Sequence, residues 1–99
     1  MKLEDWRNEI DSIDAEIVRL VNQRATVAKK IGVLKATAGL PVADADRETE
    51  VLRGVCGRSS GALTDESLVR IFRQILCESR LIQTKTVGEM AENKTEIHR

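Results

Sequence analysis

The sequence predicts an all-α protein with three helices per chain, in the order long, short, long. Apolar residues recur at helical spacing over residues 3–34 and again over 68–87. No stretch alternates apolar and polar residues in the manner of a half-buried strand. The single proline, Pro41, falls between the two periodic regions, where a helix has to stop.

The first helix is expected over about residues 3–37. No proline or glycine interrupts its apolar pattern before Gly32, and a helix of about 35 residues is about 50 Å long, so it cannot fold back on itself. Gly39 suits the C-cap of this helix, and Pro41 cannot continue it. Its apolar residues form a heptad seam. The seam consists of Leu3, Trp6, Ile10, Ile13, Ile17, Leu20, Val27, Ile31 and Leu34.

The second helix is expected over about residues 45–57, which is only about three turns. Either Asp44 or Asp46 can cap its N-terminus. The stretch from Gly57 to Gly61 is a flexible connector by composition.

The third helix is expected over about residues 63–88, with Thr64 or Asp65 as its N-cap. Beyond it, the tail over 89–99 loses the apolar period and is expected to fray. Neither a repeat nor a linker divides the chain, so residues 1–99 are expected to form a single domain.

The composition argues against several classes of function. Sixteen basic and sixteen acidic residues give a formal net charge of zero, whereas surfaces for nucleic acids or anionic membranes need a basic excess. No apolar run approaches the roughly 20 residues that span a bilayer, and the N-terminus lacks a signal peptide, so we expect a cytoplasmic protein. Cys56 and Cys77 form no CxxC pair and His98 stands at the C-terminus, so we expect reduced thiols and no metal site.

Two cations share one face of the first helix. Arg24 occupies a position that the seam assigns to an apolar residue, where an arginine can specify register or extend its charge to solvent. Lys35 stands eleven residues further on, about 20° away around the helix and about 16 Å along it. A small anion with two carboxylates fits between two such side chains. A lysine near a helix C-terminus is, however, also favoured by the helix dipole alone.

Polar residues also interrupt the apolar stripe of the third helix. Ser79 and Gln83 stand where a core is expected, and buried donors need partners. A serine bonded back to its own helix and a glutamine at the rim would meet this need, and so would a bound polar ligand. In the second helix, Arg47 is a cation at the end whose dipole disfavours cations, which indicates a further role.

Four motifs follow one another along the chain. They are LEDWRNEIDSID from residue 3, LVNQR with KKIGVLK up to residue 35, PVADADRE from residue 41, and ESRLIQ up to residue 83. In this order they resemble the all-helical chorismate mutase family, including the mutase domain of bifunctional chorismate mutase/prephenate dehydratase proteins. The resemblance covers nearly the whole chain, from residue 3 to about 87, and implies an intertwined homodimeric helical bundle.

The resemblance implies an isomerase that rearranges chorismate to prephenate in phenylalanine and tyrosine biosynthesis. This is an intramolecular reaction without net proton transfer, and the resemblance implies neither a cofactor nor a metal. The residues that it places in the site are Arg7, Arg24, Lys35, Asp44, Arg47, Glu48, Ser79 and Gln83.

The resemblance also implies a role for each of these residues. Arg7, Arg24 and Lys35 would fix the two substrate carboxylates, one of which Ser79 also meets. Lys35 would act as the catalytic lysine, with Gln83 beside it at the ether oxygen.

At the start of the second helix, Asp44 and Glu48 would hold the substrate hydroxyl. The catalytic residues would be Arg24, Lys35, Glu48 and Gln83. Arg47 would order Glu48 and add positive potential.

Geometry adds a separate point about Arg7. It lies seventeen residues before Arg24, about 25 Å away along a straight helix, and cannot reach the same site within its own chain. If Arg7 binds the substrate, it enters the site of a partner chain, and the protein is then a homodimer with two shared sites.

Two alternatives remain open from the sequence. An isochorismate-pyruvate lyase has the same fold and acts on a closely similar dianion. A non-catalytic helical dimerisation module would use only the seam, and the polar residues would set the register of the helices or lie at the surface.

Overall fold

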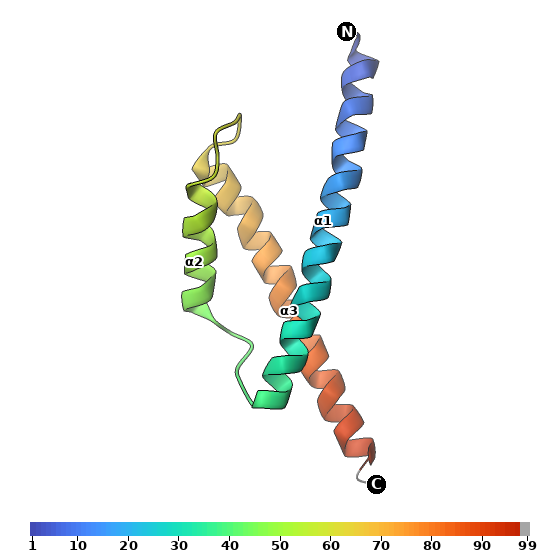
Figure 1. Ribbon diagram of the computed structural model, residues 1–99, viewed down its shortest axis with the longest axis vertical. Coiled ribbons are helices and arrows are strands. Elements are labelled where there is room, and N and C mark those ends of the chain that lie inside the picture. Colours follow the sequence, from blue (N-terminus) through green and yellow to red (C-terminus); the bar gives the residue numbers. More distant parts are fainter. Residues whose placement is uncertain (98–99) are drawn as a thin grey trace.

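The structure, a computed structural model, describes residues 1–97 and forms three α-helices over that range (Figure 1). They are α1 (Leu3–Ala38), α2 (Ala45–Cys56) and α3 (Asp65–Ile97). The described residues include no strand. The predicted all-α class and the order long, short, long are thereby confirmed.

The third helix is longer than the sequence predicted. Its end was expected near residue 88, with a frayed tail over 89–99, whereas α3 continues to Ile97. The apolar period does stop, but residues 89–92 include glutamate, methionine and alanine, which favour a helix without any apolar face. Lys85 and Glu89 also form a pair across one turn, with 4.0 Å between Nζ and Oε1. The last two residues of the expected tail, 98–99, lie outside the described range.

Local sequence explains where the helices begin and end. Gly39 follows α1 with a φ of 68°, in the left-handed region that favours glycine. The Asp44 side chain accepts a hydrogen bond of 3.0 Å from the backbone N–H of Arg47 and caps α2. The Thr64 hydroxyl oxygen accepts one of 3.1 Å from the N–H of Ser67 and caps α3. Of the caps expected for each helix, Asp44 rather than Asp46 caps α2, and Thr64 rather than Asp65 caps α3.

The helices form an open layer rather than a closed bundle. The molecule extends 65 × 29 × 14 Å along its principal axes. α3 crosses α1 and also packs along α2 (Figure 1). The crossing lies in the C-terminal half of α1, so the N-terminal half of α1 stands apart from the other helices (Figure 1).

Little of the single chain is buried. Among the described residues, the buried apolar side chains are Ala28 on α1 and Leu76 on α3. By contrast, the seam of α1 faces outward, with Trp6 51% and Ile10 56% exposed. An apolar face of this extent on one helix is typical of a surface that another chain covers.

Gly32 marks the closest approach of α1 to α3. A Cβ atom at this position would lie 3.1 Å from the Cα of Gln83 and 3.1 Å from the Cβ of Thr86. These neighbours are a backbone atom and the first atom of a side chain, so neither can swing away. Because position 32 has no side chain, the next turn of α1 can bring Lys35 against Gln83.

We expect Gly32→Ala to lower the free energy of unfolding by about 1 kcal/mol, because an overpacking cost of about 2 kcal/mol, within the usual range of about 1–3 kcal/mol, outweighs a helix-propensity gain of about 1 kcal/mol. Gly88→Ala is the matched control on α3, since a Cβ at Gly88 would meet nothing within 4 Å. It should leave stability unchanged or raise it. Urea unfolding of both variants at one protein concentration measures the difference. A Gly32→Ala variant as stable as the parent would contradict this account of the crossing.

Candidate functional site

A pocket with a cavity volume of about 350 Å³ lies between the three helices, within the range of about 300–1,000 Å³ that is usual for small-molecule sites. Its polar lining includes all the predicted site residues except Arg7. These are Arg24, Lys35, Asp44, Arg47, Glu48, Ser79 and Gln83. Apolar side chains such as Ala28 and Leu76 complete the walls. Side chains from distant parts of the sequence therefore share one small cavity.

Lys35 is oriented by two acceptors. Its Nζ donates to Gln83 Oε1 on α3 and to the carbonyl oxygen of Val42 in the loop before α2, each at 2.9 Å. An ammonium group carries three N–H donors, so one remains for a ligand. Because the ammonium can only donate, the Gln83 oxygen must face it and the Gln83 amide N–H groups remain as donors. Gln83 is only 9% exposed, so it lies inside the fold and not at its rim.

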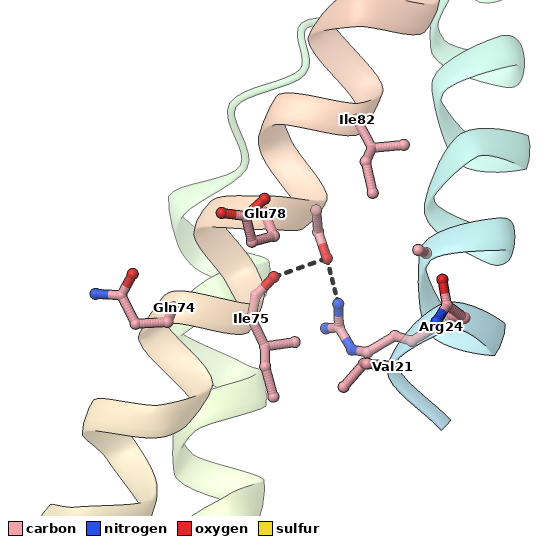
Figure 2. Close-up of a pocket in the computed structure, with 9 residues that line it drawn as sticks. Val21, Arg24, Gln74, Ile75, Glu78 and Ile82 are labelled. Atoms are coloured by element: carbon pink, nitrogen blue, oxygen red, sulfur yellow. Dashed lines mark hydrogen bonds between the residues drawn. The ribbon is translucent and has the colours of Figure 1, made fainter. Parts of the chain in front are cut away.

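Arg24 is held against α3 by Ser79. The Arg24 guanidinium donates to the Ser79 hydroxyl oxygen, and the Ser79 hydroxyl donates to the carbonyl oxygen of Ile75 at 3.0 Å. Figure 2 shows Arg24 reaching from α1 toward α3, with dashed lines for both hydrogen bonds. Ser79 thus bonds back to its own helix, as one alternative predicted, and also anchors a cation of the site.

Glu48 at the start of α2 pairs with an arginine that the sequence reasoning missed. Arg80 on α3 donates to Glu48 Oε1, and this hydrogen bond raises the pKa of Arg80 above its ordinary value. Arg47 instead pairs with Glu50 at 3.3 Å on the exposed side of α2. The two side chains thus have different partners in this structure, and the expectation that Arg47 orders Glu48 stays a prediction. Both side chains line the pocket, but neighbouring residues on a helix point about 100° apart, and each pairs with a different group.

The charges of the pocket favour an anion. Three cations line it, namely Arg24, Lys35 and Arg47, against the carboxylates of Asp44 and Glu48. Asp44 is engaged as the cap of α2, and the charge of Glu48 is balanced by Arg80 from outside the pocket lining. Arg24 and Lys35 donate to neutral acceptors, which fix their directions and leave their charges for a ligand, whereas Arg47 pairs with Glu50.

Arg7 stands away from this pocket. It lies in the first turns of α1, in the half of the helix that no other element covers (Figure 1). Because α1 runs as one helix from Leu3 to Ala38, Arg7 cannot bend back toward Arg24. The structure thus brings seven of the eight predicted residues to one cavity and leaves the eighth on an exposed helix.

Other expectations concern metals, membranes and thiols. Over the described residues, no group of three or more His, Cys, Asp or Glu side chains is placed to hold a metal ion. None of the described helices is sufficiently long and apolar to cross a membrane. Cys56 and Cys77 are free and partly buried.

Comparison with known proteins gives a consistent result. Residues 6–84 match the sequence profile of the family described as chorismate mutase type II. The chain is 46% identical over 77 residues to the bifunctional chorismate mutase/prephenate dehydratase of Neisseria gonorrhoeae, a match that covers 78% of this chain and 21% of that protein. It is 33% identical over 97 residues to the chorismate mutase of Methanocaldococcus jannaschii, a match that covers 94% of each. The chain thus spans about a quarter or less of the bifunctional relatives that it matches.

Two solved structures have the same fold. The chorismate mutase (form II) of Thermus thermophilus superposes with a TM-score of 0.82 at 30% identity, and the match covers 85% of this chain and 96% of that one. The chorismate mutase of Helicobacter pylori, in complex with prephenate, superposes with a TM-score of 0.81 at 31% identity over 88% of this chain and 94% of that one.

We expect Arg24→Met to raise the free energy of unfolding of the ligand-free protein by about 0.5–2 kcal/mol, because it removes repulsion between the pocket cations and restores an apolar residue to the seam. Thermal or urea unfolding measures the change. Arg19→Met is the control, since Arg19 pairs with Glu16 at the surface of the same helix and should change stability by less than about 0.5 kcal/mol. A clear loss of stability in Arg24→Met would show that the bond to Ser79 outweighs the repulsion.

Proposed function

The chain belongs to the chorismate mutase type II family, and from this premise we propose that it rearranges chorismate to prephenate as an isomerase in phenylalanine and tyrosine biosynthesis. The observation that carries the proposal is the hydrogen bond of 2.9 Å between Lys35 and Gln83 at the wall of a cation-lined pocket. It prepares two donors for one atom of a ligand, which is what this rearrangement needs.

The substrate is a dianion with two carboxylates, and the pocket offers cations to both. We assign one carboxylate to Arg24, whose guanidinium Ser79 orients, and the other to an arginine from a second chain, with Lys35 adding its positive charge. Side chains of this length can extend from positions about 16 Å apart on α1 to a ligand between them. Fixing both carboxylates selects the chair-like conformer before reaction, which is catalysis by orientation.

The chemical step breaks one C–O bond as one C–C bond forms, and negative charge grows on the ether oxygen. We place the remaining N–H of Lys35 and the amide N–H of Gln83 at this oxygen. Both side chains are already held by their mutual hydrogen bond, so little reorganisation opposes the reaction and the developing charge is bound better than the ground state. Asp44 and Glu48 are assigned to the substrate hydroxyl, and Arg47 contributes positive potential.

We further propose that two chains form a homodimer in which Arg7 of each chain enters the site of the other. The exposed apolar seam of α1 supports this, because the chain itself leaves it uncovered. An apolar pocket of about 360 Å³ beside Arg24 and Ser79 adds to the uncovered surface (Figure 2). An intertwined pair of chains would bury both the seam and this apolar pocket, and Arg7 of the second chain would add its cation to the site. The single domain over residues 1–99 and the cytoplasmic location stay predictions.

We expect Lys35→Ala to lower kcat/KM for chorismate at least about a hundredfold, since loss of one donor to a developing charge costs about 3 kcal/mol. The fall in chorismate absorbance at neutral pH measures the rate, and acid conversion to phenylpyruvate identifies prephenate. Lys30→Ala is the matched control, because Lys30 is an exposed lysine of the same helix. Lys30→Ala should retain the parental rate.

The same assay separates the alternatives. Pyruvate from isochorismate, with chorismate left unchanged, would identify a lyase. If neither substrate reacted, and neither chorismate nor a bicyclic transition-state mimic raised the unfolding temperature, the non-catalytic dimerisation module would replace the proposal.

For the shared site, we expect Arg7→Ala and Lys35→Ala to be nearly inactive alone and to regain activity when unfolded together and refolded as a mixture. Half of the dimers would then be mixed, and each mixed dimer has one site with both residues, so about a quarter of the parental activity should return. The rate of the mixture is compared with the sum of the separate rates. A mixture no faster than that sum would place Arg7 outside the site.

A further inference from the structure

We propose that Arg80 is a positioning residue of the site, which holds Glu48 so that one carboxylate oxygen faces the substrate hydroxyl and the carboxylate stays off the pocket cations. The inference rests on the proposed function. Arg80 touches no part of the cavity, so its action on the substrate passes through Glu48.

The pairing joins α3 to α2 beside the pocket that Glu48 lines. Arg80 Nη1 on α3 donates to Glu48 Oε1 on α2. A carboxylate has two oxygens with room for several hydrogen bonds, so Oε2 remains to accept from a hydroxyl in the cavity that Glu48 lines. The fork of the guanidinium gives this contact a direction that a lone ammonium lacks.

Glu48 without such a partner would have a competing choice. It shares a small cavity with three cations, and an unrestrained carboxylate would pair with one of them and neutralise the charge meant for the substrate. In the structure the three cations have other partners. Arg24 donates to Ser79, Lys35 donates to Gln83 and Arg47 pairs with Glu50.

The solvent exposure of the pair argues against a mainly structural role. The side chains of Arg80 and Glu48 are 42% and 28% exposed, and ion pairs this open to water contribute little to stability. The geometry therefore predicts a variant that folds normally and reacts slowly.

The experiment is a double-mutant cycle with Arg80→Met, Glu48→Gln and the combination of both, measured as kcat and KM for chorismate and as unfolding temperature. Arg80→Met should lose on the order of tenfold in kcat/KM, because a Glu48 carboxylate that is out of position orients the substrate less well. Arg80→Lys should recover part of this loss. The double variant should be no slower than Glu48→Gln alone, since Arg80 acts only through Glu48. Arg73→Met, an exposed arginine on α3, is the control for loss of charge and should match the parent.

A second substrate separates positioning from misfolding. With chorismate that lacks its ring hydroxyl, the loss caused by Arg80→Met should be smaller than with chorismate, because the contact that Arg80 supports is then absent and only the pairing of Glu48 with the pocket cations remains. Equal losses on both substrates, additive losses in the cycle, or a parental rate in Arg80→Met would each overturn the inference. A parent that forms no prephenate would overturn the proposed function and this inference together, whereas an active parent with additive losses would overturn the inference alone.

Discussion

The close crossing of α1 and α3 at Gly32 determines where the polar groups of the pocket lie. With no side chain between the helices at this point, one turn further along α1 Lys35 meets Gln83. Toward the other end of α1, Arg24 meets Ser79 on the same side of α3. Both contacts join a cation of α1 to a neutral polar group of α3. The cavity is therefore built by the same packing that holds the two long helices together.

Much of this arrangement could be predicted from the sequence, because helical period and caps are local properties. The polar residues at Arg24, Ser79 and Gln83 broke an apolar pattern, which indicated a site before any contact was known. The pairing of Arg80 with Glu48 could not be predicted, since it depends on how α2 packs on α3. Arg80 is adjacent to Ser79 in sequence but points about 100° away around the helix, outside the apolar stripe that the prediction followed.

The length of α3 escaped prediction for a different reason. Loss of apolar period shows that a face no longer packs, but it does not end a helix unless a breaker follows. Residues 89–97 contain neither proline nor glycine, and α3 extends to Ile97. The end of α1 could be predicted, because Gly39 is a residue type that commonly ends a helix, and in the structure it has the positive φ of such a cap.

The continuity of α1 makes the protein sensitive to changes in length at one place and tolerant of them elsewhere. In the proposed dimer, α1 carries Arg7 for one site and Arg24 with Lys35 for the other. The helix therefore fixes the rotation and the distance between the residues that it contributes to the two sites. Insertion of one residue between positions 7 and 24 would turn Arg7 by about 100° relative to Lys35, whereas an inserted heptad would nearly restore the phase but shift Arg7 by about 10 Å. A change in length in the loops at 39–44 and 57–64 would not rotate Arg7 relative to Lys35. Insertions and deletions among related enzymes should therefore accumulate in the second loop, which is far from Lys35 in sequence and supplies no predicted site residue.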